Sequence, residues 1–346
     1  MAGSGCQPLP EIEHETEHLR LGTDFDAPVC AGTLAMLDRA VGRIAASLDP
    51  DGSDEPFVVY WLEDELPDYC DDDATGCFYP GTRIAFAQGD SIAHELVHAT
   101  IDSPGHAYFV EEGMAELYGG TPVRHDPRDL RGELLTQLAL SRRDYDHGRL
   151  SYDQAAHFAH WVRETEGDGA MLRLAAALSG EDGETEILDQ LEGIFDMTPW
   201  GIEQTYVREA PRLFPGLYDA RLPTQRLEEG SLWLSVSLDC DDDEVLGPLR
   251  GAEEGMARLL RLEVPRPRTT RLLMEGDPGT WVELVAPYAP GQRPYPPWWP
   301  AFDQEGRMTR LEPGHRVSVM LEAGTYLLVF GASRVGAADI DLQVLR

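Results

Sequence analysis

The apolar residues of this chain change their periodicity near residue 229, and this change limits the folds that the chain can adopt. From Leu232 onward, apolar and polar residues alternate in short runs that Gly- and Pro-rich turns separate. The clearest runs are residues 232–236, 259–264, 281–285, 317–321 and 326–330. A period of two is typical of strands with one buried face, and no helix-length period survives here. The sequence therefore predicts an all-β sandwich of about seven strands over residues 229–346.

Residues 17–125 combine strand and helix patterns. The apolar residues between Leu34 and Leu48 recur at steps of three and four, which predicts a helix with one apolar face. Runs of strand-forming residues predict three strands at 18–21, 57–62 and 83–87. An acidic loop with two cysteines, residues 68–81, separates the last two strands. We therefore expect an α/β subdomain in this region.

The pattern from 126 to 228 is helical, most clearly at 130–143 and 152–162. This pattern predicts a helical subdomain between the α/β subdomain and the sandwich. Residues 1–16 carry no such pattern, so we expect a flexible N-terminal segment. Taken together, the three regions predict a fold of the α+β class.

The charge of the chain excludes one class of partner. Its 346 residues include 62 Asp and Glu against 28 Lys and Arg, which gives a formal net charge of −34. Such a surface repels a phosphate backbone, so we expect no nucleic-acid partner. No apolar run approaches the roughly 18–20 residues that span a bilayer, and no signal-peptide pattern occurs in this chain.

The five cysteines favour an exported protein. Cys70 and Cys77 lie in the acidic loop, where free thiols would be exposed. Cys6 follows small residues, as a lipidated N-terminal cysteine does once a leader is removed, and we expect membrane anchoring only through such a Cys6. The other four cysteines would form two disulfides in one of three pairings. The alternative is a cytosolic protein with five free thiols. We expect an extracellular or cell-envelope location in bacteria.

The segment His94-Glu95-Leu96-Val97-His98 is an H-E-x-x-H motif on a predicted helix. Two histidines four residues apart lie on one helix face, so both imidazoles can bind one metal ion. Zn²⁺ accepts such nitrogen ligands in tetrahedral geometry. Glu95 would lie beside the metal, where it can take a proton from a metal-bound water and return it to a leaving amine.

A third protein ligand is needed, and residues 109–116 carry three carboxylates on the next predicted helix. Here the chain resembles the gluzincin metallopeptidases, in which a Glu on a second helix completes H-E-x-x-H, and in particular their bacterial members with a Glu-Gly-x-Ala segment. The resemblance implies a zincin-like fold for residues 17–125, Glu112 as the third ligand and Glu116 as the partner of a ligand histidine. The gap after His98 is shorter than in the best-known gluzincins, where the ligand would be nearer Glu116. Both assignments stay open, and Glu111 is disfavoured.

The resemblance also implies an oxyanion donor from the following helical region. Tyr152 is our candidate catalytic residue there, and His157 and His160 are weaker ones. The alternative for all three is ordinary packing or partial exposure. His106, in the loop before the second helix, could also face the metal, although solvent exposure is the simpler expectation.

These features predict a zinc-dependent peptide hydrolase that acts on a peptide or protein substrate. In zincins an edge strand pairs with the extended substrate, and the resemblance assigns that role, at the rim of the cleft, to residues 83–87. The alternative function is a non-catalytic envelope or adhesion protein, in which the zincin-like domain is structural and the β-sandwich binds the partner. An open metal position beside a potential base favours the enzyme, because a structural zinc site would need neither.

Overall fold

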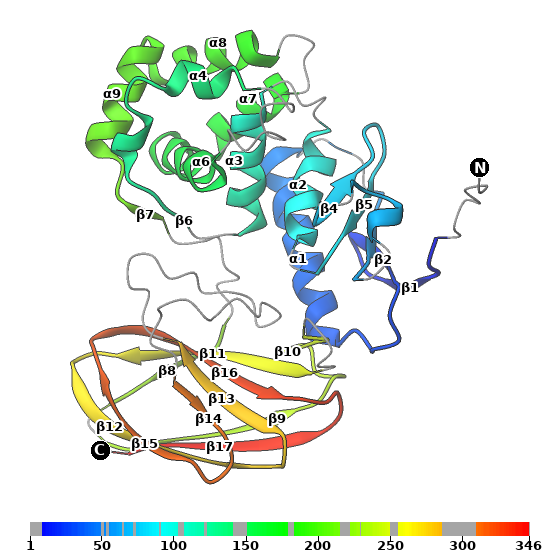
Figure 1. Cartoon of the computed structure of the whole chain (residues 1–346), viewed down its shortest axis with the longest axis vertical. Helices are drawn as coiled ribbons and strands as arrows, with labels where there is room; N and C mark the ends of the chain where they lie inside the picture. The colour runs from blue at the N-terminus through cyan, green and yellow to red at the C-terminus, as the bar shows by residue number, and fades with distance from the viewer. Residues whose placement is uncertain are drawn as a thin grey trace. The chain divides into compact units, whose positions relative to one another are not determined.

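The structure of the chain is a computed structural model (Figure 1). It describes residues 9–49, 52, 55–63, 66–71, 74–89, 91–102, 107–120, 123–140, 151–178, 183–214, 222–228, 230–249, 255–285 and 309–345. These residues form two compact units. The first unit comprises Met1–Phe25 and Leu37–Tyr218, and the second comprises Asp26–Met36 and Asp219–Arg346. Cys6 and His106 lie outside the described residues. No described helix has the length and hydropathy that a membrane crossing requires.

The first unit contains a mixed five-stranded sheet. Its strands are β1 (Ile12–Glu15), β2 (Leu19–Thr23), β3 (Phe57–Trp61), β4 (Gly76–Phe78) and β5 (Ile84–Ala87). The strand order is β1-β2-β3-β5-β4, with β2, β3 and β5 parallel and both outer strands antiparallel to their neighbours. The three inner strands are the predicted ones, because their apolar runs suit strands with buried faces. Helix α1 (Ala31–Leu48) has the predicted apolar face, which buries Leu37, Val41 and Ile44.

The two outer strands of this sheet correct two expectations. Residues 83–87 do not form the rim, because β5 pairs with β3 on one side and β4 on the other. The edge strand is β4, which lies inside the expected loop and is too short to show an alternating pattern. Residues 12–15 belong to no flexible segment, since they pair with β2. Their polar sequence is typical of an outer strand, where charged side chains discourage pairing with another chain.

Helices make up most of the remainder of the first unit. They are α2 (Ile92–Ile101), α3 (Tyr108–Gly119), α4 (Leu134–Leu138), α6 (Tyr152–Glu166), α7 (Asp168–Leu178), α8 (Gly183–Phe195) and α9 (Pro199–Glu209). Short elements join them: the 3-10 turns η1 (Leu66–Asp68) and η2 (Pro127–Leu130), and the strand pair β6 (Val123–Arg124) and β7 (Leu213–Phe214). The predicted helix at 130–143 is interrupted at Gly132, whose φ of 80° is left-handed.

The predicted helical subdomain and the sheet region belong to one compact unit. α2, α3 and α6 lie side by side (Figure 1). A Cβ atom at Gly113 of α3 would lie 2.5 Å from the carbonyl oxygen of Ala155 of α6, so a glycine permits this close approach. Phe109 and Phe158 also meet there, with ring centroids 5.8 Å apart. α3 therefore packs against both α2 and α6, and it joins the sheet region to the helical region.

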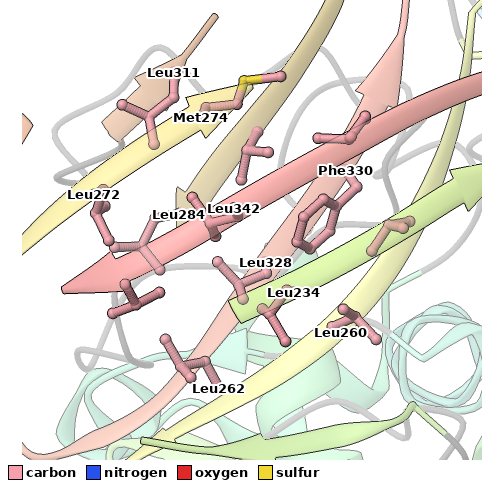
Figure 2. Packing of buried hydrophobic residues seen from close by; sticks show 14 of the residues in the cluster. Leu234, Leu260, Leu262, Leu272, Met274, Leu284, Leu311, Leu328, Phe330 and Leu342 are labelled. Atoms are coloured by element: carbon pink, nitrogen blue, oxygen red, sulfur yellow. The ribbon is translucent and has the colours of Figure 1, made fainter. Parts of the chain in front are cut away.

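The second unit is a β-sandwich. One sheet has the order β10 (Val245–Leu246), β11 (Met256–Val264), β16 (Gly324–Ala332), β13 (Thr280–Val285) and β14 (Thr309–Leu311), with β8 (Thr224–Arg226) parallel to β11. The other has the order β15 (Arg316–Leu321), β12 (Arg268–Gly276), β17 (Ala338–Leu345) and β9 (Leu232–Leu238). Side chains of both sheets share one core, which includes Leu234, Leu272, Leu328, Phe330 and Leu342 (Figure 2). The predicted sandwich is confirmed. The five runs named from the sequence form β9, β11, β13, β15 and β16, and β12 and β17 bring the long strands to the expected seven.

Two disulfides join the four described cysteines, Cys30 to Cys240 and Cys70 to Cys77. The Cys30–Cys240 disulfide lies within the second unit. It explains why residues 26–36 belong to the second unit, although the segments before and after them belong to the first. Next to it, the backbone N–H of Gly247 donates to Thr33 Oγ1, and that hydroxyl donates to the Gly247 carbonyl, each at 2.8 Å. No local pattern in the sequence encodes a pairing across 210 residues.

Candidate metal centre

Two consecutive helices of the first unit carry the H-E-x-x-H motif and the carboxylates that follow it. α2 buries Ile92, Leu96 and Ala99, which leaves the two histidines on another face. It ends at Asp102, whose left-handed φ of 50° turns the chain and whose N–H donates to the His98 carbonyl. α3 ends in the same manner at Gly120, with a φ of 94°. These two stops keep both helices short.

The nitrogen atoms of the two histidines and one carboxylate oxygen of α3 lie close together. His94 Nε2 and His98 Nε2 are 3.0 Å apart. Glu112 Oε2 lies 3.2 Å from the former and 3.5 Å from the latter. In a tetrahedral zinc site with bonds of about 2.0–2.1 Å, neighbouring ligand atoms are about 3.3 Å apart. The spacing of the three atoms therefore fits three corners of such a site.

The hydrogen bonding of Glu112 supports the same fit. Its Oε2 atom is buried and makes no hydrogen bond. Buried carboxylate oxygens without a partner are rare in proteins, because losing hydration costs free energy that nothing replaces. A cation between this oxygen and the two imidazoles would satisfy it. The residues present therefore suit a divalent metal ion.

Each of the two histidines is oriented by a further carboxylate of α3, a different one for each ring. His94 Nδ1 lies 3.3 Å from Glu116 Oε1, and His98 Nδ1 lies 3.1 Å from Glu111 Oε1. A ring N–H that donates to a carboxylate leaves the other ring nitrogen free to accept, which is the arrangement common around metal-binding histidines. Glu112, not Glu116, is the carboxylate that the structure brings to both Nε2 atoms.

The contact of Glu111 with His98 was not predicted from the sequence. A signal was present, however, because Phe109, Val110, Met114 and Ala115 predict a buried stretch of α3, and Glu111 lies within it. A carboxylate at a buried helix position needs a partner. In the structure that partner is His98 Nδ1.

Glu95 lies beside the ligand atoms and against β4. A Cβ atom at Gly76 would lie 2.5 Å from Glu95 Cγ and 2.7 Å from its Oε1, so glycine leaves the space that this side chain fills. Burial raises the pKa of Glu95. On the same strand, the Phe78 ring stacks on His98, with centroids 5.7 Å apart and planes 7° apart. The edge strand thus contacts both the potential base and a potential ligand.

The charged groups of the cluster shift one another's pKa values. Burial alone would lower the pKa of His94, but its contacts with Glu112 and Glu116 raise that pKa to about 10. Burial would raise the pKa of Glu112, but the two imidazoles facing it hold that pKa below its usual range. A metal ion would compete with protons for the nitrogen atoms of these imidazoles.

The structure brings Tyr152 to this cluster but not the two histidines of α6. The Tyr152 ring lies 6.3 Å from the His94 ring, measured between centroids. Ser151 begins α6 as its N-cap and accepts a hydrogen bond from the Gln154 N–H. His160 stacks on Phe214, with centroids 5.4 Å apart. The expectation of an oxyanion donor therefore has support only for Tyr152.

His157 is a buried structural histidine, which explains why it is not at the metal centre. Its Nε2 donates to the Pro211 carbonyl at 2.7 Å, so its Nδ1 accepts from the Tyr206 hydroxyl at 2.7 Å. Burial lowers the pKa of His157 to about 4. The folded protein therefore favours the neutral ring, whereas the unfolded chain binds a proton near pH 6.5.

This shift predicts a loss of stability at acid pH. The lowered pKa of His157 adds to the free energy of unfolding, and this addition is fully present above pH 6.5 and is lost as the pH falls towards 4. We expect the addition to be about 3 kcal/mol. Urea unfolding at pH 7 and pH 4.5 should show a larger loss in the wild type than in His157→Gln. The exposed His315→Gln is the control, and equal losses in wild type and His157→Gln would reject the assignment.

A second group of potential ligand atoms, from Glu17, His18 and Asp38, is already occupied by protein contacts. Asp38 Oδ1 accepts hydrogen bonds from Thr16 Oγ1 at 2.6 Å and from the His18 N–H at 2.8 Å. Glu17 is exposed. The group therefore stabilises the turn between β1 and β2, and we assign it no metal.

Comparisons with known proteins assign no family to the chain. No protein-family model and no curated protein matches it. Among solved structures it is similar to PliG of Aeromonas hydrophila, a periplasmic inhibitor of g-type lysozyme, with 14% identity over 36% of this chain and 96% of that chain, at a TM-score of 0.24. It is also similar to the pre-peptidase C-terminal domain of a Bacillus anthracis collagenase, with 11% identity over 37% of this chain and 99% of that chain, at a TM-score of 0.23.

Proposed function

We propose that this chain is a zinc-dependent peptide hydrolase with a gluzincin-type site. His94, His98 and Glu112 would hold the metal. The observation that carries the proposal is the convergence of their three ligand atoms at 3.0–3.5 Å from one another, with the Glu112 oxygen buried and lacking a hydrogen bond. Glu111 and Glu116, behind the histidines, support the same assignment.

The donor set favours a catalytic ion. Two imidazoles and one carboxylate are three protein ligands, and catalytic zinc sites keep a fourth position for water or substrate. When bound, zinc supplies an electrophile that polarises a carbonyl and lowers the pKa of water. The four carboxylates around the two histidines leave the site negatively charged without an ion, which favours cation binding.

Other residues of this site would transfer the proton, stabilise the oxyanion and bind the peptide. Glu95 would accept a proton and return it to the leaving amine, and its burial keeps its pKa above the ordinary value, closer to neutral pH. Tyr152, near His94, would donate to the developing oxyanion. In the described part of the chain, β4 has one side without a paired strand, so an extended peptide could pair with it next to Glu95 and His98.

We further propose that the protein acts outside the cytoplasm. Two disulfides join its four described cysteines, and disulfides persist in oxidising compartments. The short Cys70–Cys77 bridge lies at the sheet edge next to the proposed site. It would not persist in a reducing cytosol.

Hydrolysis of a mixed peptide library tests the proposed function. The protein is assayed zinc-loaded, after removal of metal by a chelator, and after zinc is restored. We expect cleavage with zinc, none after chelation, and recovery on restoration. Zinc binding without cleavage would instead support the non-catalytic envelope protein, in which the β-sandwich binds the partner. Absence of zinc binding would reject both.

A further inference from the structure

The side chains of the three residues of β4 contact different groups on the two faces of the sheet. Successive side chains of a strand point to opposite faces. Gly76 and Phe78 face α2, where they contact Glu95 and His98. Cys77 points to the other face, where the Cys70–Cys77 pair packs against the cluster of Tyr60, Leu62, Leu66 and Phe86. One residue of the strand thus fixes it to the sheet, and its neighbours contact the proposed site.

β4 is a short strand. Among the described strands it pairs with β5 alone, through Gly76 with Ala87, Cys77 with Phe86 and Phe78 with Ala85. The Gln88 N–H also donates to the Thr75 carbonyl at 2.9 Å, and the Tyr79 N–H to the Ile84 carbonyl at 3.1 Å. A short strand with one neighbour has fewer backbone hydrogen bonds than an inner strand and opens more easily. The disulfide joins it to Cys70, whose N–H donates to the carbonyl of the buried Leu66 at 3.0 Å. The bridge is therefore a second, covalent attachment of β4, in addition to its pairing with β5.

The two disulfides of the chain differ in access to a reductant. Cys30 is completely buried, Cys240 is partly exposed, and the bond between them spans 210 residues. Cys70 and Cys77 are both partly exposed, and their bond spans 7 residues. Thiol–disulfide exchange requires a thiolate to reach a sulfur atom. Both cysteines of the Cys70–Cys77 bond are partly exposed, against one of the Cys30–Cys240 bond, so we expect the Cys70–Cys77 bond to react first.

We propose that the Cys70–Cys77 disulfide is a redox-sensitive latch that positions β4 against Glu95 and His98. This inference rests on the proposed function. A dithiol would open the latch: its thiolate attacks one sulfur, a mixed disulfide forms, and the other cysteine leaves as a thiol after protonation. The second thiol of the reductant then displaces the first cysteine. The dithiol is oxidised to a disulfide, and Cys70 and Cys77 take up its two electrons and two protons.

The latch acts on the positions of Glu95 and of the substrate, not on metal binding. The three proposed ligands lie on α2 and α3, and the carboxylates that orient them lie on α3. β4 supplies neither a ligand nor an orienting carboxylate, and its contact with this group is the Phe78 ring on His98. Opening the latch should therefore reduce hydrolysis and leave zinc bound, which separates the latch from a general role in folding.

The test compares Cys70→Ser/Cys77→Ser with the matched pair Cys30→Ser/Cys240→Ser. Three quantities are measured: hydrogen exchange of a peptide covering residues 74–79, the Kd for zinc, and kcat/KM for peptide hydrolysis. For the first variant we expect faster exchange in that peptide, a Kd within about threefold of wild type, and kcat/KM lower by about 10-fold or more, because small displacements at a catalytic site are costly. The control pair should keep wild-type exchange at 74–79.

A titration of the wild type with dithiothreitol gives an independent check if the variant folds poorly. Alkylation mapping should find Cys70 and Cys77 modified before Cys30 and Cys240, and reoxidation should restore hydrolysis. Unchanged exchange at 74–79 after this reduction would overturn the latch. Loss of zinc together with unfolding of α2 would also overturn it, because the bridge would then be purely structural. If the wild type hydrolyses no peptide, the proposed function fails, whereas hydrogen exchange still tests the latch.

Discussion

Replacing Glu95 by Gln is expected to lower kcat/KM for peptide hydrolysis by about 10²–10⁴-fold, the usual contribution of a positioned general acid–base. Gln has nearly the same shape as Glu, so it can fill the space that Gly76 leaves and the fold should be retained. It cannot accept and return a proton. Zinc affinity should change little, because Glu95 lies outside the group of potential ligands.

The control for this prediction is Glu164→Gln, a change at an exposed carboxylate of α6. Both variants are assayed zinc-loaded, with steady-state kinetics on a peptide that the wild type cleaves. A Glu95→Gln enzyme with near wild-type kcat/KM would show that the base lies elsewhere. Loss of activity accompanied by loss of zinc would assign Glu95 to metal binding instead.

Replacing Glu112 by Gln is expected to weaken zinc binding by about 10²–10³-fold. Apparent zinc-binding free energies of about 10–16 kcal/mol, shared by four ligands, give about 2.5–4 kcal/mol for each. Glu112 is the carboxylate within 3.5 Å of both Nε2 atoms, and an amide is a much weaker ligand. Hydrolysis at limiting zinc should fall with the affinity. Competition with a chromophoric chelator measures the effect.

Glu116→Gln and Glu111→Gln are the matched controls on the same helix. Each would remove the partner of one Nδ1 atom, and such changes typically cost about 10–100-fold in metal affinity. The expected order is therefore a larger loss for Glu112 than for either neighbour. If Glu116→Gln has the largest effect, Glu116 is the third ligand and the assignment made here is wrong.

The local parts of the site could be predicted from the sequence. The spacing of His94 and His98 within one helix fixes their common face, whatever the rest of the fold does. The same holds for Glu112 and Glu116, four residues apart on α3. The sandwich was predictable for a similar reason, because a period of two is a property of each strand alone.

The parts that escaped prediction depend on contacts between distant segments. β4 has three residues and therefore no readable period, although it contacts both Glu95 and His98. Glu111 contacts His98 only because α3 packs against α2, which no pattern within either helix encodes. Residues 26–36 join the second unit through a disulfide to Cys240, and four cysteines allow three pairings that sequence spacing does not distinguish.

The central claim is that His94, His98 and Glu112 share one divalent cation. Anomalous diffraction at the zinc absorption edge, from crystals of the zinc-loaded protein, tests it most directly. We expect a single strong peak in the first unit, about 2.0–2.2 Å from Nε2 of both histidines and from Glu112 Oε2. A peak on other residues, or no peak there at full zinc loading, would contradict the claim.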